Sequence, residues 1–216
     1  IENKIPLDIF AGNGKHIGSF LSASSCQCEL WEQQALCPQE KRNHLGAALI
    51  EGKLTNQLNL IKYFHKYHKQ RTEEYQLLLD QMETHVKEYK LFMKSAHYTE
   101  QDCVGKIMAQ ESQGALKYWA YIRSLLEDDD VGFKGRTGQG ATDLVNCMLN
   151  YGYAILYSRV WQALLRAQLN PYDSIIHVRQ RGKPTFVYDV VELFRAQAVD
   201  RVVISLVQKK EPMEVK

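Results

Sequence analysis

The feature that most constrains the fold is an apolar stripe with the spacing of an α-helix between residues 45 and 64. Apolar side chains recur there at steps of three, four and one, which places them on one face of a helix. The pattern predicts a long helix that begins near Pro38 and buries this face against other elements. The stripe consists of Leu45, Leu49, Ile50, Leu54, Leu58, Ile61 and Phe64.

Three further stretches have helical patterns. Residues 72–95 form one of them, a helix of roughly 25 residues follows Thr99 and Asp102, which have the pattern of a capping pair, and a third runs from Thr142 to about Leu169. Thr142 is suited to cap this last helix. The chain is therefore expected to be mainly α.

The remaining segments of the C-terminal half combine loops and helices. Residues 127–140 contain four glycines and mixed charges, which predict a loop. Asn170-Pro171 interrupts the preceding helix because the residue before a proline disfavours helical backbone angles. A short helix bearing His177 is then expected, followed by the basic loop 179–184 and a helix over 185–207.

The N-terminal part of the chain differs from the rest. Residues 5–10 and 16–21 are short β-like runs on either side of a Gly/Asn turn, which predicts a hairpin, and 22–25 are a small polar linker. A lone hairpin is only marginally stable in water. The hairpin must therefore pack on the helices or belong to a larger sheet whose other strands are absent from this sequence.

Composition narrows the class of protein. The 216 residues are 45% hydrophobic and 24% charged, which is typical of a globular chain with one sizeable core. A net charge of +2 is too small to identify a nucleic-acid binder, so any DNA contact must come from clustered charge. Five unevenly spaced cysteines do not suggest a disulfide framework, and the sequence contains neither a signal peptide nor a membrane span. We therefore expect a cytoplasmic protein without a membrane partner.

Acidic and imidazole side chains occur at four places in the helical part. Glu111 opens Glu-Ser-Gln-Gly-Ala, His177 ends Asn-Pro-Tyr-Asp-Ser-Ile-Ile-His, and Asp189 and Glu192 are three residues apart. On one helix, side chains at i and i+3 share a face, so both carboxylates can approach one ion. Carboxylates are hard ligands for Mg²⁺ and Mn²⁺, and the imidazole favours Mn²⁺. These four residues are candidate catalytic groups.

Each candidate also has an ordinary structural interpretation. Glu111 alone fits a solvated helix residue, and His177 fits a core histidine bonded to a backbone carbonyl. Asp189 and Glu192 can equally cap a helix or pair with Arg195. Taken singly, the residues do not decide between structure and chemistry.

Basic side chains on glycine-bearing loops are candidate phosphate contacts, although solvated loop residues have the same composition. These are Arg136, Arg179, Arg181 and Lys183.

The order of these motifs resembles that of a known family. Polar residues interrupt the helix pattern at 143–153, between the segments of Glu111 and His177, and the Asp189/Glu192 pair comes last. Read together, these segments resemble the CRISPR-associated spacer integrases of the Cas1 family, which insert captured DNA into the CRISPR array. The centre of the first long helix, where Lys53 precedes Asn-Gln, is also similar to the family.

The resemblance implies residue roles and domains. It implies a metal triad of Glu111, His177 and Glu192 holding Mg²⁺ or Mn²⁺, with Asp189 as a neighbouring acid. It also implies that residues 1–24 are the end of an N-terminal β-sandwich domain and that 25–216 are a C-terminal helical catalytic domain. Two positions depart from the usual family pattern, because Ser112 and Ser174 stand where glycine is common.

The resemblance also implies partners. The family works as a homodimer joined through its N-terminal domains, and two dimers flank a small ferredoxin-like CRISPR adaptation subunit on prespacer and CRISPR-repeat DNA. Members are sometimes fused to a reverse transcriptase. The sequence resembles only part of such a protein, which we interpret as a fragment or a trimmed fusion chain.

Three functions follow as hypotheses. The first is a metal-dependent DNA endonuclease and integrase, in which the 3′-hydroxyl of a captured fragment attacks a phosphodiester at the edge of a CRISPR repeat. The second is a non-catalytic helical module for DNA binding or assembly in a CRISPR or reverse-transcriptase fusion complex. The third is a general metal nuclease on branched DNA, which shares the site and differs only in substrate.

Overall fold

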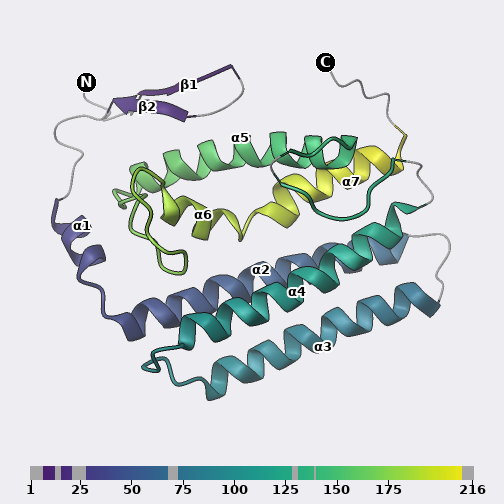
Figure 1. The fold of residues 1–216 in the computed structure, drawn as a ribbon, viewed down its shortest axis with the longest axis horizontal. Coiled ribbons are helices and arrows are strands. Elements are labelled where there is room, and N and C mark those ends of the chain that lie inside the picture. Colours follow the sequence, from purple (N-terminus) through teal and green to yellow (C-terminus); the bar gives the residue numbers. More distant parts are fainter. Residues whose placement is uncertain are drawn as a thin grey trace.

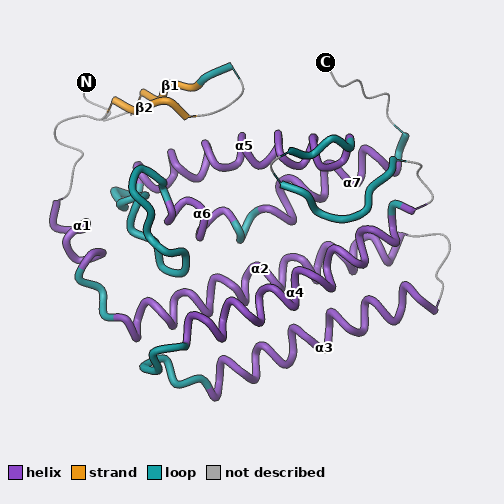
Figure 2. Tube along the Cα trace, viewed as in Figure 1, coloured by secondary structure: helices purple, strands orange, loops and turns teal. Residues whose placement is uncertain are grey.

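The protein is described by a computed structural model that places residues 7–12, 16–20, 28–67, 73–127, 131–138 and 140–210. Within these ranges the chain is mainly helical, with a single antiparallel pair of strands, as the sequence predicts (Figures 1 and 2). None of the described helices combines the length and apolar composition needed to cross a membrane.

The two strands form the expected hairpin. β1 (Leu7–Phe10) pairs with β2 (His16–Phe20), and the register shifts between Ile9 and Phe10. Apolar side chains such as Leu7 and Phe20 are 63% and 65% exposed on this hairpin. The linker predicted at 22–25 lies outside the described residues, and the assignment of 1–24 to a separate domain remains a prediction.

Three long helices form one layer of the molecule. α2 (Gln39–Tyr67), α3 (Glu73–Ser95) and α4 (Cys103–Leu125) pack against one another along their lengths (Figure 1). Most of the predicted apolar stripe is buried in this layer, and only Leu45, near the start of α2, is as much as 40% exposed. Burial of such a stripe, rather than helix propensity, supplies most of the stability of helices in proteins.

The second layer is built from the C-terminal half of the chain. It contains α5 (Leu144–Arg166), α6 (Thr185–Val191), the π-helical turn η3 (Ala196–Asp200) and α7 (Arg201–Gln208). Figure 1 shows α5, α6 and α7 lying over the layer of α2, α3 and α4, and η3 contacts both α2 and α5. A short helix, α1 (Cys28–Ala35), precedes α2.

The helix caps predicted for α4 and α5 differ from those in the structure. Asp143, not Thr142, occupies the N-cap of α5, and its carboxylate accepts a hydrogen bond from the backbone N–H of Asn146 at 2.9 Å. Asp102 is at the N-cap of α4 but makes no capping hydrogen bond, and it instead lies 3.4 Å from the ammonium of Lys106.

The prediction that His177 lies on a short helix is also wrong. Residues 171–177 form turns and bends. Pro171 has no N–H to donate, and the carboxylate of Asp189 accepts the backbone N–H groups of residues 175, 176 and 177. Because these donors bond to a side chain, they are not used in a helical ladder.

The continuous helix predicted over 185–207 is broken in the structure. α6 ends at Val191, a turn follows over 192–194, and one π-helical turn precedes α7. As a result, Asp189 and Glu192 do not share one regular helix, because Glu192 is the C-cap of α6. Single π turns inside helices often occur at functional sites.

Candidate functional site

Three charged side chains from separate helical segments meet between the two layers. Lys53 belongs to α2, Glu111 to α4, and Glu192 follows α6 directly. Lys53 Nζ contacts Glu111 Oε1 and lies 2.7 Å from Glu192 Oε2. The three side chains, which we call the junction cluster, are only 11%, 16% and 11% exposed.

A fourth charge completes this group. Arg195 Nη1 lies 2.5 Å from Glu192 Oε1. Burial opposes the charge of the Lys53 ammonium, but the nearby carboxylates of Glu192 and Glu111 outweigh that effect, and the pKa of Lys53 is raised. Lys53 is therefore cationic at neutral pH, and the two cations balance the two carboxylates.

His177 is held beside the junction cluster by a fully buried carboxylate. Asp189 Oδ1 is 2.5 Å from His177 Nδ1, and the Asp189 side chain has no solvent exposure. This hydrogen bond is the largest influence on His177 and raises the pKa of the imidazole, while burial works against it. The Glu192 carboxylate also raises the pKa of His177, and the Lys53 ammonium lowers it.

The same Asp189 carboxylate shapes the loop that carries His177. It accepts backbone N–H groups from Ile175 at 2.5 Å, Ile176 at 3.1 Å and His177 at 3.2 Å. With these bonds and the imidazole, its oxygens are fully occupied. Asp189 therefore orients His177, and its four hydrogen bonds leave it no free lone pair for a metal ion.

Contacts from α2 hold the other end of this loop. Arg42 Nη1 donates to Asp173 Oδ1 at 3.1 Å and to the carbonyl of Ser174 at 2.8 Å. A Cβ atom on Gly46 would lie 3.0 Å from Ile176, so this glycine allows the loop to approach α2 closely. Both ends of the 173–177 segment are thus tied to buried groups.

A second buried network lies behind the junction cluster. Asp200, which is 1% exposed, accepts hydrogen bonds from the hydroxyls of Tyr118 at 2.7 Å and Tyr153 at 2.5 Å. Burial raises the pKa of Asp200 to about 6, although both hydrogen bonds oppose this shift. The guanidinium groups of Arg136 and Arg195 lie 5.1 and 4.8 Å from the centre of the Tyr153 ring.

A small polar cavity joins the two networks. It has a volume of about 60 Å³ and is lined by Lys53, Gln57, Glu192, Arg195 and Asp200, among others. Within the described residues, Gln57 Oε1, Arg195 Nε and Glu192 Oε2 are buried without a hydrogen-bond partner. Glu192 Oε2 is not free, however, because it lies 2.7 Å from the Lys53 ammonium.

The candidate phosphate contacts divide into two kinds. Arg136 is partly buried and donates to the side-chain oxygens of Asn146 at 3.0 Å and Asn150, which ties the 131–138 loop to α5. Arg179 is exposed and contacts Asp173. Arg181 and Lys183 are exposed beside the loop of His177. Arg136 thus holds the loop against α5, while the other three lie on the surface, and phosphate contact by each of the four remains a prediction.

The sequence analysis assigned no role to several residues that the structure places at the site. Lys53 is one helical turn from Ile50 and from Gln57 on the buried face of α2, so a lysine inside the apolar stripe was the available signal. Tyr118, Tyr153 and Asp200 come from three different elements, and no sequence spacing brings them together.

The predicted divalent cation can be tested against these side chains. Within the described ranges, no three His, Cys, Asp or Glu side chains are arranged to hold an ion as they stand, and the Lys53 ammonium lies between Glu111 and Glu192. The donors nevertheless fit a hard cation, because the two carboxylates converge on one position that a cation, the Lys53 ammonium, already occupies. His177 has Nε2 left for a ligand because Asp189 engages Nδ1, the usual arrangement of a ligating histidine.

A two-layer helical domain with a buried acid pair and an oriented histidine is an arrangement suited to metal-dependent phosphodiester chemistry. Comparison with known proteins gives the family. The model of the family described as CRISPR associated protein Cas1 matches residues 1–214. The chain therefore belongs to the Cas1 family.

Individual relatives agree with this assignment. The chain is 28% identical over 222 residues to CRISPR-associated endonuclease Cas1 1 of Archaeoglobus fulgidus, which covers 98% of the chain and 63% of the relative. It is 31% identical over 201 residues to a protein of the same name from Methanospirillum hungatei, covering 92% and 56%. The chain thus spans less than two thirds of the length of these relatives.

Among solved structures, a casposase bound to integration product superposes with a TM-score of 0.74 at 22% identity, covering 99% of this chain and 56% of that one. At this identity the likeness shows the fold alone, and it confirms the helical architecture.

Proposed function

We propose that the protein is a metal-dependent DNA endonuclease and integrase of CRISPR adaptation. The observation that carries the proposal is the convergence of Glu111 and Glu192 on one buried cationic position, beside an imidazole oriented by Asp189. Family membership supports the same function, since relatives are named Cas1 endonucleases.

The residues have distinct roles in this proposal. Glu111, Glu192 and Nε2 of His177 would hold Mg²⁺ or Mn²⁺, once Lys53 has left the space between the two carboxylates. When bound, such an ion lowers the pKa of an attacking hydroxyl and stabilises charge on the phosphodiester. Asp189 engages Nδ1 of His177, which would leave Nε2 available to hold the ion.

The proposed reaction joins captured DNA to a CRISPR repeat. The 3′-hydroxyl of the prespacer attacks a phosphodiester of the repeat, a new phosphodiester forms, and the displaced 3′-oxygen leaves with a proton. The low exposure of the junction cluster limits competition from water. Hydrolysis by the same groups would give the endonuclease activity.

The DNA and protein partners are also proposals. Arg179, Arg181 and Lys183 are exposed beside the His177 loop, where they can contact backbone phosphates. A homodimer and a small ferredoxin-like adaptation subunit are what the family resemblance implies for this chain. A fused or associated reverse transcriptase and a Cas2 partner are supported by a similar solved structure, a partial Cas6-RT-Cas1–Cas2 complex. That structure has a TM-score of 0.74 at 21% identity, and this chain covers 61% of it.

Alanine substitution of the three ligands tests the function. Glu111→Ala, His177→Ala and Glu192→Ala should each lower Mn²⁺-dependent cleavage and strand transfer by more than about a hundredfold, while Asp189→Asn should cost about 10 to 100-fold, as is typical of groups that orient a ligand. Oligonucleotide joining measures both activities.

Glu83→Ala is the matched control, because Glu83 also pairs with a lysine of α2, Lys62, at 2.7 Å but lies at the surface. Near-normal activity in any ligand variant would show that the assignment is wrong. DNA binding without any joined or cleaved product in the unsubstituted chain would instead favour the non-catalytic module.

Salt dependence tests the DNA contacts. Affinity for duplex DNA falls as salt rises, and each phosphate contact makes the plot of log affinity against log salt steeper by about 0.9. Arg181→Ala and Lys183→Ala should therefore each make this plot shallower by about 0.9. The control is Arg166→Ala, which removes an exposed cation at the end of α5. An unchanged slope in the first two variants would remove these residues from the DNA path.

A further inference from the structure

The junction cluster and Arg195 together carry no net charge before any ion binds. Lys53 contacts both Glu111 and Glu192, and Arg195 contacts the second oxygen of Glu192 at 2.5 Å. Two cations therefore face two carboxylates. All four side chains are largely buried, with Arg195 the most exposed at 27%, so this balance is not screened as it would be at the surface.

A divalent ion added to this neutral group would create an excess of two positive charges at a buried position. Such an excess is unfavourable unless anions enter with the ion. The Lys53 ammonium also lies where the ion would bind, between the two carboxylates. Phosphates of DNA supply the missing negative charge and offer a new partner for the displaced lysine, whose flexible stem allows its ammonium to move.

We propose that Lys53 is a built-in competitor of the divalent ion, which keeps the site closed to metal until DNA phosphates arrive and makes metal and DNA binding mutually dependent. The inference rests on the proposed metal-dependent function. It adds a role for a residue that is neither a metal ligand nor one of the surface DNA contacts. By linkage, DNA must tighten the binding of the metal by the same factor as metal tightens the binding of DNA.

A purely structural role for Lys53 makes the opposite prediction. If Lys53 only joins α2, α4 and the end of α6, its loss weakens the packing that holds Glu111 and Glu192 together, and metal binding becomes weaker or stays unchanged. The two roles therefore differ in the sign of one measurable quantity, the affinity for metal in the absence of DNA.

The experiment is a titration of Mn²⁺, followed by the loss of free-ion electron paramagnetic resonance signal, with and without a short DNA duplex. The 216-residue chain is compared with Lys53→Met, which keeps the side-chain length and removes the charge. Without DNA, Lys53→Met should bind Mn²⁺ on the order of tenfold more tightly, equivalent to about 1.4 kcal/mol. With DNA, the affinity of the unsubstituted chain should rise by a similar factor, and that of Lys53→Met should change little.

Two further variants control for location and folding. Lys62→Met removes a lysine of the same helix from the exposed pair with Glu83 and should leave Mn²⁺ affinity unchanged. Adding Glu111→Gln to Lys53→Met should remove the gained affinity, because the ion then lacks one carboxylate. If Lys53→Met does not fold, Lys53→Gln, which can still donate hydrogen bonds to the carboxylates, replaces it in the same titration.

The outcomes separate the inference from the function on which it rests. Mn²⁺ binding that is equal or weaker in Lys53→Met, with normal binding by the unsubstituted chain, would overturn the competitor role and leave the metal-dependent function intact. No Mn²⁺ binding by any variant, with or without DNA, would overturn both. Tighter binding that persists when Glu111→Gln is added would show that the ion binds elsewhere, and would also overturn the inference.

Discussion

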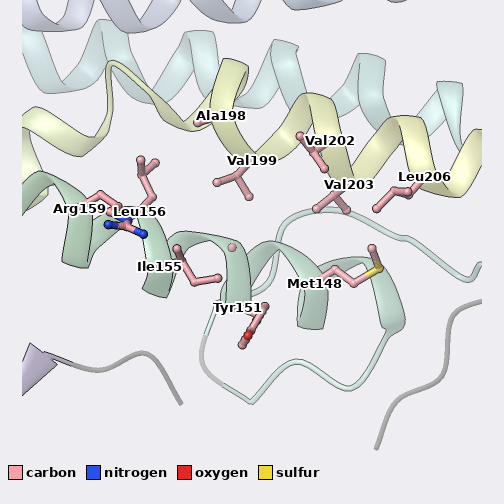
Figure 3. Close-up of a pocket in the computed structure, with 11 residues that line it drawn as sticks. Met148, Tyr151, Ile155, Leu156, Arg159, Ala198, Val199, Val202, Val203 and Leu206 are labelled. Atoms are coloured by element: carbon pink, nitrogen blue, oxygen red, sulfur yellow. The ribbon is translucent and has the colours of Figure 1, made fainter. Parts of the chain in front are cut away.

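The segment from Glu192 to Leu206 lies between two unlike environments. On one side, Glu192, Arg195 and Asp200 face charged and hydroxyl groups of α2, α4 and α5. On the other side, an apolar groove of about 430 Å³ opens between this segment and α5 (Figure 3). Its lining consists of Met148, Tyr151, Gly152, Ile155, Leu156, Arg159, Ala198, Val199, Val202, Val203 and Leu206.

Two adjacent residues lie on opposite sides of this segment, one in the apolar groove and one in the buried polar network. Val199 extends into the groove toward α5, as Figure 3 shows, while the carboxylate of Asp200 bonds to two tyrosine hydroxyls on the buried side. The polar side depends on charge and hydrogen bonds, so its stability should respond to pH. The apolar side depends on shape, so its stability should respond to side-chain volume. This difference gives the predictions below, from the largest expected effect to the smallest.

The largest effect should come from Asp200. Its pKa is about 6 in the folded protein against 3.8 as the ordinary value. Because the folded-state pKa is the higher one, the folded chain keeps a proton that the unfolded chain releases as pH rises between these values. The contribution of Asp200 to the free energy of unfolding should therefore fall by about 3 kcal/mol through this window and stay level above it.

Asp200→Asn tests this contribution, since the amide does not titrate. Urea unfolding of both proteins at about pH 4, 5, 6 and 7 gives the free energies. Because the series starts just above the ordinary pKa, the unsubstituted protein should lose about 2.5 kcal/mol relative to the variant across it. Two curves that run parallel would show that Asp200 ionises normally and that the polar side is not governed by its burial.

The second prediction concerns volume on the apolar side. A Cβ atom on Gly152 would lie 2.5 Å from Cγ1 of Val199, whose branched side chain has little rotamer freedom. Gly152→Ala should therefore destabilise the protein by about 1 to 3 kcal/mol, the usual cost of overpacking. Urea unfolding measures the loss, which should be independent of pH between about 5 and 7.

Gly105→Ala in α4 is the matched control. Nothing lies within 4 Å of a Cβ atom at that position, so the substitution should stabilise the helix by about 0.5 to 1 kcal/mol. If both variants change stability in the same direction, the close approach of α5 to η3 is not a tight one in solution.

Much of this fold could be predicted from sequence because its helices are long and periodic. The stripe from Leu45 to Phe64 predicted α2, and the hairpin followed from a turn between two apolar runs. The loop of His177 could not be predicted this way. Its conformation depends on Asp189, more than ten residues away, whose carboxylate accepts three of its backbone donors.

The arrangement of the candidate site also could not be predicted from sequence spacing alone. Glu111, His177, Asp189 and Glu192 were recognised by their order, but sequence spacing suggested that Asp189 and Glu192 share one ion. In the structure Asp189 bonds to the 175–177 backbone, whereas Glu192, the C-cap of α6, pairs with Lys53. Spacing within a helix does not show which distant groups each carboxylate will bond to. The roles of the four residues in catalysis remain predictions.

The smallest effect should distinguish the floor of the groove from its rim. Val202 and Val203 are adjacent on α7 and both line the groove, but Val202 is 52% exposed and Val203 only 5%. Truncation to alanine removes two methyl groups, which costs about 1.5 kcal/mol at a buried position at ~0.8 kcal/mol each. The gain in helix propensity is the same for both variants, so Val203→Ala should be less stable than Val202→Ala by about 1 kcal/mol. The stability of Val202→Ala should stay within about 0.5 kcal/mol of the unsubstituted protein.

Urea unfolding of the two variants, with equal slopes against denaturant, measures the difference. An equal cost for both valines would mean that Val202 is covered in solution, and the groove would then not be open as the structure shows it.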